Sequence, residues 1–164
     1  MRMSTRGRYG VAALYELAAN DSGGPLALRQ IAETQGLSEN YLEQLFLVLR
    51  RAGLVSGVRG AQGGYVLARP AAEITVGDII RALEGPVAPV ACVADPALCT
   101  RDGALSTACP TRPVWVKLAD CMSRVLDSIN LSDLVAVSAE EQAALAGTCA
   151  CQDCTTPLGR HEHG

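Results

Sequence analysis

The sequence predicts a mainly α-helical fold with a small β-wing: a winged helix-turn-helix followed by a long dimerisation helix. Three observations predict this class. Two short amphipathic segments are joined by a glycine turn, a glycine-rich hairpin follows them directly, and a later segment repeats apolar residues in heptads. The 164-residue chain is long enough to bury the aliphatic core that such a fold needs.

The first three predicted helices form the helix-turn-helix and its support. Apolar residues recur at helical spacing over 8–20, until a cluster of Asn, Asp, Gly and Pro residues ends the run. A short helix over 28–35 ends at Gly36, and Ser38 is placed to cap a third helix over 39–52. A tight glycine turn between two short helices is typical of a helix-turn-helix, although an ordinary helical hairpin has the same pattern.

A β-hairpin is predicted directly after the third helix. Segments 54–58 and 64–67 have the composition of strands, and the glycine-rich tip between them begins at Arg59. This order is the winged arrangement, in which a glycine-rich tip lets the backbone approach a phosphate closely. A nucleotide-binding P-loop is the rival interpretation, but no Gly-Lys-Ser/Thr follows and the loop leads into a strand.

Two or three further helices complete the predicted fold. Thr75 and Asp78 have the spacing of a capping box for a helix over 76–84. A longer helix over 114–130 carries apolar residues that advance by three and four, as in a coiled-coil seam: Trp115, Leu118, Met122, Val125 and Ile129. We expect this seam to pair two copies, because binding to palindromic DNA needs two half-site contacts. A last short helix is expected over 138–146.

Charge is divided unevenly along the chain. Residues 1–70 hold eight arginines and five acids, which gives +3, and the remainder carries −6, for a total of −3. A basic first half on an acidic protein indicates a polyanion site confined to one part. No apolar run reaches 18 residues and the charged N-terminus lacks the apolar stretch of a signal peptide, so we expect a cytoplasmic protein.

The candidate DNA contacts lie mainly on the third predicted helix. Asn40 and Gln44 can pair with adenine edges in the major groove, and Glu43 can accept a hydrogen bond from a cytosine amino group. Glu43 as a plain solvated acid is the alternative. Arginines are candidates for phosphate or minor-groove contacts. The full set of candidate DNA-binding residues is Arg2, Ser38, Asn40, Tyr41, Glu43, Gln44, Arg50 and Arg59.

Three of the seven cysteines lie in the proline-rich segment that precedes the long helix. Cys92, Cys99 and Cys109 have the spacing C-x6-C-x9-C, which matches neither a zinc knuckle nor a thioredoxin-type pair. In a reducing cytoplasm the cysteine count favours metal or redox chemistry over a disulfide framework. The residues alone leave a metal site, including tetrahedral zinc, and a thiol redox switch open. No general base accompanies these thiols in the sequence, so we do not expect an enzyme.

The chain resembles the Rrf2 family of bacterial transcription regulators, most closely its iron–sulfur cluster regulators. The resemblance covers about residues 1–135 and rests on MRMSTRGRYGV, YLEQLF, LVSGVRGAQGGYVLAR and VGDIIRALEG. It implies a winged-helix homodimer that binds double-stranded operator DNA. It further implies an iron–sulfur cluster, of the [2Fe–2S] type, on Cys92, Cys99 and Cys109, with cluster-assembly proteins as partners. Another branch of the family, controlled by thiol redox state or a cysteine-metabolism partner without a cluster, is the alternative.

The position of the fourth cluster ligand departs from the pattern of the cluster-binding relatives. They have a histidine three residues after the last cysteine, and this chain has Arg112 there. A guanidinium keeps its protons and has no free lone pair, so it is a poor ligand. Arg112 is therefore only a positional candidate. The other candidates are Asp95, Asp102, Cys149, Cys151, Cys154, His161, His163, an external thiol and water.

These predictions divide the chain into four parts. We expect a winged helix-turn-helix DNA-binding domain over 1–85 and a cysteine-bearing cluster loop over 86–113. A dimerisation helix over 114–135 and a C-terminal tail over 136–164 follow. This order places the cluster loop between the DNA-binding domain and the dimerisation helix. The expected function is a transcription regulator whose cluster occupancy alters operator preference.

Overall fold

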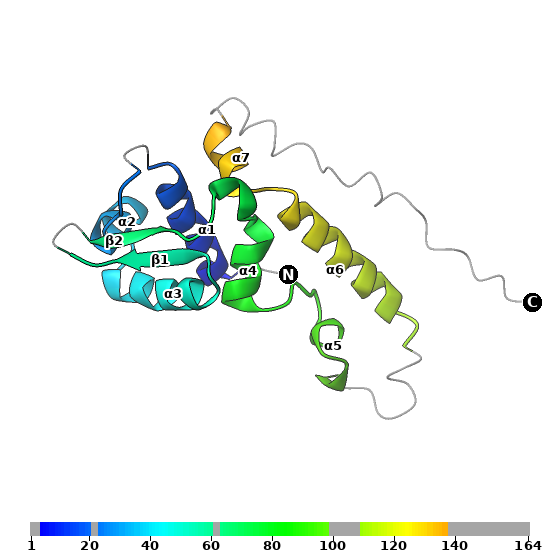
Figure 1. Cartoon of the computed structure of the whole chain (residues 1–164). Helices are drawn as coiled ribbons and strands as arrows, with labels where there is room; N and C mark the ends of the chain where they lie inside the picture. Colours follow the sequence, from blue (N-terminus) through cyan, green and yellow to red (C-terminus); the bar gives the residue numbers. More distant parts are fainter. Residues whose placement is uncertain (1–3, 21–22, 61–62, 99–108, 138–164) are drawn as a thin grey trace, which may run out of the picture.

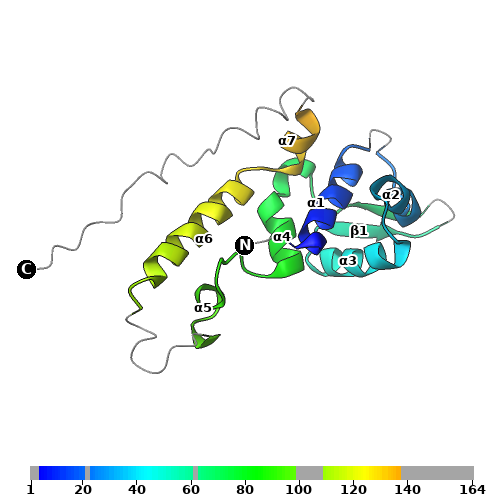
Figure 2. The same cartoon turned by 180° about the vertical axis from the view of Figure 1, so that it is seen from behind.

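The computed structural model describes residues 4–20, 23–60, 63–98 and 109–137, and it confirms a mainly helical fold with a two-stranded wing (Figure 1). The elements in chain order are α1 (Thr5–Ala18), α2 (Leu28–Gln35), α3 (Glu39–Arg51), β1 (Val55–Val58), β2 (Gly64–Leu67), the 3-10 turn η1 (Ala71–Glu73), α4 (Val76–Glu84), α5 (Ala91–Ala94), the 3-10 turn η2 (Pro96–Leu98), α6 (Arg112–Asp127) and α7 (Leu131–Ala136). We call α1–α4 with β1 and β2 the head. The long α6 runs along one side of it and contacts α4 (Figures 1 and 2).

The head begins with helices whose ends are fixed by local signals. α1 starts three residues before the predicted boundary because Ser4 caps it: the Gly7 N–H donates to Ser4 Oγ at 3.3 Å. Ser38 caps α3 in the same way, accepting the Tyr41 N–H at 3.3 Å. Between α2 and α3, Gly36 adopts a φ of +63°, a left-handed conformation that favours glycine. The predicted helix-turn-helix is thereby confirmed.

One aliphatic core holds the head together. Its fully buried large side chains come from every helix of the head, from β1 and the residue before it, from the residue that follows η1, and from α7: Leu14, Ile31, Leu42, Leu45, Phe46, Leu49, Leu54, Val55, Ile74, Ile79 and Leu131. Burying each such side chain contributes about 1.5–3 kcal/mol relative to leaving it exposed. α7 is therefore packed onto the head rather than onto α6.

The wing is an antiparallel hairpin attached to the head by one additional strand-like residue. β1 and β2 pair with Val55 opposite Leu67 and Val58 opposite Gly64. Leu26 adds a bridge on the other side of β2: its N–H donates to the Tyr65 carbonyl at 3.0 Å and its carbonyl accepts the Tyr65 N–H at 2.9 Å. The Tyr65 ring meets Phe46 edge-on at 4.7 Å between centroids, so the wing is fixed to α3.

α1 and α4 approach each other closely because α1 presents two glycines. A Cβ at Gly10 would overlap the Leu83 side chain, and a Cβ at Gly7 would overlap Glu84. Above this contact Ser4 Oγ donates to Glu84 Oε1 at 2.6 Å. This contact fixes α4 against α1, and α4 in turn contacts α6.

A long helix, α6, is present where one was predicted over 114–130, but a second helix, α7, occupies the end of the range 114–135 assigned to the dimerisation helix. α6 starts at Arg112 and ends at Asp127, where Ser128 Oγ donates to the Val125 carbonyl at 2.9 Å. α7 then starts at Leu131. The heptad pattern did not predict the break between α6 and α7, because it depends only on the spacing of apolar residues.

A capping box at Asn130 starts α7 and removes Ile129 from the predicted seam. The Asn130 side chain accepts the Asp133 N–H at 3.0 Å, and Asp133 accepts the Asn130 N–H at 3.0 Å. Ile129 lies in the connection, where its carbonyl accepts the Val76 N–H at 2.9 Å. Its backbone therefore links the connection between α6 and α7 to the start of α4.

The segment predicted as a loop over 86–113 contains two short helical elements, α5 and η2. Asp95 separates them: its N–H donates to the Ala91 carbonyl at 2.9 Å, and its Oδ1 accepts the Ala97 N–H at 2.9 Å. The helix predicted over 138–146 lies outside the described residues. Within the described ranges no helix is long and apolar enough to cross a membrane.

Candidate DNA-recognition face and cysteine site

The solvent side of α3 is a polar face, which we call the recognition face. Leu42, Leu45, Phe46 and Leu49 point into the core. The exposed residues are Glu39, Asn40, Glu43, Gln44, Leu47, Arg50 and Arg51. The structure therefore places four predicted DNA contacts of this helix, Asn40, Glu43, Gln44 and Arg50, together on one exposed face.

The N-terminal end of α3 is held by aromatic contacts with α1. The Tyr41 ring lies edge-on to Tyr9 with 6.1 Å between centroids, and the Arg8 guanidinium lies 5.8 Å from the Tyr9 ring centroid. Tyr41 is half-buried, so this predicted DNA contact also positions the helix. Ser38 is exposed, but its hydroxyl accepts the Tyr41 N–H as the cap.

The wing presents the other predicted contact. Arg59 is exposed directly after β1. Gly60 has a φ of +129°, and a Cβ at Gly63 would lie 2.6 Å from the Val58 carbonyl oxygen, so both positions require glycine. Part of the tip, Ala61 and Gln62, lies outside the described residues, as does the predicted contact Arg2.

Of the three predicted cluster ligands, Cys92 lies on α5 and Cys109 lies three residues before α6, which α5 contacts. Both are half-buried thiols. The Cys109 Sγ lies 3.3 Å from Thr111 Oγ1. The third predicted ligand, Cys99, lies outside the described residues.

Arg112 is the first residue of α6 and lines an open pocket beside Cys109. The pocket has a volume of about 420 Å³, and its lining is Cys109, Arg112, Pro113, Val116, Lys117 and Asp120. The backbone N–H of Arg112 donates to the Cys109 carbonyl at 3.2 Å. Arg112 thus stands next to the last cysteine of the loop, where its cation can offset thiolate charge.

The donor set can be compared with the needs of an iron–sulfur cluster. Thiolates are the usual ligands of such clusters, so Cys92 and Cys109 suit one, whereas the guanidinium of Arg112 does not. Within the described part of the chain, no three His, Cys, Asp or Glu side chains gather as a metal site. Of the other candidate fourth ligands only Asp95 is described, and its Oδ1 accepts the Ala97 N–H.

Cys121 lies on α6 and is half-buried. The sequence favoured a small buried thiol at this position beside the apolar seam. In the structure Cys121 is disulfide-bonded. Thiol chemistry in this protein therefore extends beyond the three loop cysteines.

The predicted dimerisation seam is only partly covered by the chain itself. Trp115 and Leu118 are 37% and 41% exposed, and their neighbour Val114 is 41% exposed. Met122 and Val125 are half-buried. The first half of α6 thus presents an apolar stripe to solvent.

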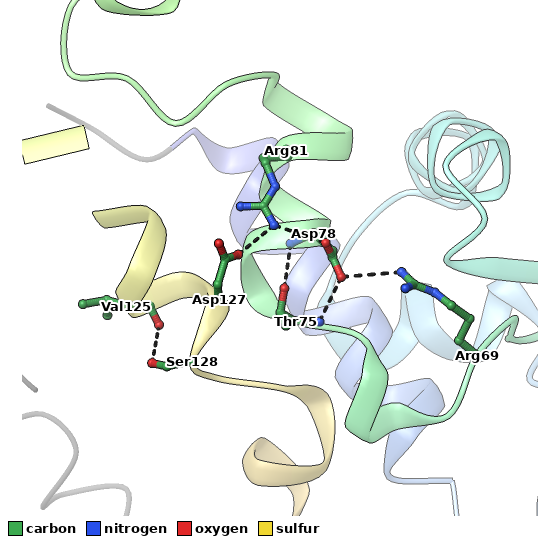
Figure 3. Close-up of polar contacts among 7 residues, drawn as sticks. All are labelled: Arg69, Thr75, Asp78, Arg81, Val125, Asp127 and Ser128. Carbon is green, nitrogen blue, oxygen red and sulfur yellow. Dashed lines mark hydrogen bonds and ion pairs between the residues drawn. The ribbon is translucent and has the colours of Figure 1, made fainter. Parts of the chain in front are cut away.

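An ion-pair network joins α6 to the head and the wing (Figure 3). Arg81 of α4 pairs with Asp127 at the end of α6 at 2.7 Å and with Asp78 at 3.2 Å. Asp78 also lies 3.5 Å from Arg69, which follows β2. Burial acts to raise the pKa of Asp78, but hydrogen bonds from Thr75 and Arg81 and the charges of Arg69 and Arg81 outweigh it and lower the pKa.

Comparison with known proteins identifies the family. A family model described as Rrf2, an iron-dependent transcriptional regulator, matches residues 3–137. The chain belongs to the Rrf2 family. It is a transcriptional regulator of that family.

Two kinds of Rrf2 protein are similar to this chain. The transcriptional regulator CymR of Bacillus subtilis is 45% identical over 144 residues, which are 88% of this chain and 96% of the relative. The regulator IscR of Escherichia coli is 41% identical over 137 residues, or 82% and 80% of the two chains.

Solved Rrf2 structures confirm the winged-helix fold. The structure of CymR, described as the global cysteine regulator of B. subtilis, has a TM-score of 0.68 at 44% identity and covers 84% of this chain and 98% of that one. The structure of T. potens IscR has a TM-score of 0.65 at 43% identity, and the match covers 97% of this chain and 94% of that one.

Sequence reasoning missed the residues that join α6 to the Rrf2 head. It identified Asp78 only as a helix cap, and it gave Arg81 and Asp127 no role. The i, i+3 spacing of Asp78 and Arg81 was a visible signal for one ion pair. No local pattern connects Arg81 with Asp127, because 46 positions separate them in the sequence.

Proposed function

We propose that this Rrf2 regulator binds operator DNA as a homodimer and that an iron–sulfur cluster on its cysteine loop controls which sites it prefers. The observation that carries the proposal is the connection between the two sites. Cys109 leads directly into α6, and the far end of α6 is ion-paired through Asp127 to Arg81 of the head. A change at the loop can therefore reach the wing through residues in direct contact.

DNA recognition rests on α3 and the wing. The capped N-terminal part of α3 enters the major groove, where Asn40 and Gln44 pair with adenine edges and Glu43 accepts from cytosine. Glu43 repels phosphate, so it discriminates between bases rather than adding affinity. Arg50 and Arg59 contact phosphates or the minor groove, and Arg2 adds a further cation near the N-terminus.

A homodimer supplies the second half-site contact. The exposed apolar stripe of Val114, Trp115 and Leu118 on α6 is the surface that a second copy covers. Covering it removes apolar area from water, which favours association. Double-stranded DNA with two-fold symmetry is the matching partner.

The cluster is of the [2Fe–2S] type and uses the thiolates of Cys92, Cys99 and Cys109. When bound, it makes the protein responsive to iron, sulfide and oxidants. Arg112 and Lys117 lie beside Cys109 and offset the negative charge of the thiolates. The fourth ligand is a group other than Arg112. Cluster-assembly proteins in the cytoplasm are the partners that load the site.

The test is selection of bound sequences from a random DNA library under anaerobic conditions, with wild-type protein and Cys92→Ser in parallel. We expect wild type to enrich a two-fold symmetric motif and Cys92→Ser to enrich a different or narrower set. Cys121→Ser is the comparison variant, because it removes a sulfur from α6 and leaves all three predicted ligands in the sequence. If neither protein enriches any motif, DNA recognition is contradicted. Identical motifs contradict control by the cluster.

Control by thiol oxidation without a cluster is a second candidate. Two observations favour it: Cys121 is disulfide-bonded, and the similar protein CymR is described as a cysteine regulator. In this case protein free of iron and sulfide changes its operator affinity when treated with peroxide, and a thiol reductant reverses the change. Cys121→Ser abolishes the response, whereas under cluster control it leaves regulation intact.

A further inference from the structure

Leu47 lies in the middle of the recognition face. It follows Glu43 by one helical turn and precedes Arg50 and Arg51 by another, so the polar residues of α3 surround it on both sides. Its side chain is 42% exposed, whereas Leu45 is 2% and Leu49 0% exposed. Among the large apolar residues described on α3, it alone is exposed to this extent.

The core does not explain an apolar residue at this position. Leu42, Leu45, Phe46 and Leu49 already fill the inward face, and Leu47 is not part of the buried cluster or of its half-buried margin. An exposed leucine contributes hydrophobic free energy only when another surface covers it. The apolar stripe of α6 is not that surface, because α4 separates α3 from α6 in both views (Figures 1 and 2).

We propose that Leu47 determines specificity for thymine by contacting its C5-methyl group in the major groove. The inference rests on the proposed insertion of α3 into that groove. The thymine methyl is the apolar group that base edges present there, and a leucine can neither donate nor accept a hydrogen bond. Leu47 therefore distinguishes thymine from cytosine, whose edge offers an amino group and no methyl.

The geometry of α3 also locates the base pair. Leu47 lies four residues beyond Glu43, which is about 6 Å along the helix axis. This rise corresponds to about two base-pair steps of about 3.4 Å each. Arg50 and Arg51, one turn further on, remain available for the phosphates that flank the same base pair. We expect this thymine to lie, in each half-site, one or two base-pair steps from the base pair that contacts Glu43.

Deoxyuridine substitution in the selected operator tests the contact directly, because it removes only the methyl group. Each thymine of one half-site is replaced in turn, and affinity is measured by fluorescence anisotropy for wild type and Leu47→Ala. We expect one replacement to weaken wild type by about fourfold, the value for one buried methylene-sized group. Leu47→Ala should bind the unmodified operator several-fold more weakly and lose that sensitivity. Leu47→Met keeps an apolar contact and should retain it.

Val135→Ala is the matched control, since Val135 on α7 is 40% exposed and lies away from α3. It should bind like wild type and keep the uridine sensitivity. If wild type and Leu47→Ala respond equally to every replacement, the inference is overturned while DNA recognition by α3 stands. If the selection yields no motif, DNA recognition fails and the inference fails with it. Matching thermal unfolding midpoints for all variants show that each is folded.

Discussion

Arg81 of α4 bridges carboxylates from two helices. Its Nη2 atom lies 2.7 Å from Asp127 Oδ1 on α6 and 3.2 Å from Asp78 Oδ1 on its own helix (Figure 3). The hydrogen bond to Asp127 raises the pKa of Arg81, whose guanidinium is protonated at physiological pH in any case. A rotation or shift of α6 therefore acts first on Arg81 and next on Asp78, which faces Arg69 beside the wing.

Asp127→Asn should weaken the attachment of α6 to the head. The ion pair is partly exposed, so we expect the free energy of unfolding to fall by only about 0.5–1 kcal/mol. The effect on regulation should be larger than the effect on stability, because operator affinity becomes less dependent on the state of the cysteine loop. Urea unfolding and anisotropy binding measure the two effects. Glu73→Gln, which removes an exposed carboxylate from η1, is the control, and an equal effect of both variants would remove the special role of Asp127.

The lowered pKa of Asp78 predicts a loss of stability in acid. The pKa of this carboxyl is lower in the folded state than its ordinary value of 3.8. Its ionised form therefore stabilises the fold fully at pH values above 3.8. This contribution disappears as pH falls from 3.8 through the lower folded value. Wild type should therefore be more stable than Asp78→Asn at pH 7, and the gap should close in strong acid. Urea titrations across this range test it, and a pH-independent gap would contradict it. Glu73→Gln controls for loss of one exposed carboxylate.

Gly64 and Gly57 make a matched pair in the wing. A Cβ at Gly64 would overlap the backbone carbonyl of Leu26 and break the bridge that attaches the wing. A Cβ at Gly57 would lie 3.8 Å from a Tyr65 ring carbon, an ordinary contact. We expect Gly64→Ala to cost about 1–3 kcal/mol and Gly57→Ala much less. Thermal unfolding measures both, and equal midpoints for the two variants would show that the bridge tolerates a methyl group.

Local signals predicted the elements that local chemistry builds. The Thr75–Asp78 capping box, the Gly36 turn and the two wing strands are each encoded by neighbouring residues, and the structure has them at the expected positions. Asn130 and Asp133 carry the same kind of signal for α7. It was overlooked because Ile129 continued the heptad spacing.

Long-range contacts could not be predicted in this way. The Arg81–Asp127 pair depends on how α4 and α6 pack, and the spacing of apolar residues does not contain that information. The cysteine site shows the same limit: its residue types were visible, but contact between α5 and α6 was not. The exposure of Leu47 also depends on which face of α3 the rest of the core covers.

Arg112→Ala should leave the cluster in place, because a protonated guanidinium is not a ligand. We expect unchanged iron and acid-labile sulfide per chain and an unshifted visible spectrum in anaerobically purified protein. Cys92→Ser and Cys109→Ser should lose both. A loss of iron and a shifted spectrum in Arg112→Ala would instead assign the fourth ligand to Arg112.

The most direct test of cluster control uses one anaerobic sample of wild-type protein. Iron, acid-labile sulfide and affinity for the selected operators are measured before and after the cluster is removed by a chelator and mild oxidation, followed by thiol reduction. Cluster control predicts about two iron and two sulfide ions per chain at the outset. It also predicts a change in affinity of at least about fivefold for one class of operator after removal. Protein without iron or sulfide, or with the same affinity in both states, would contradict it.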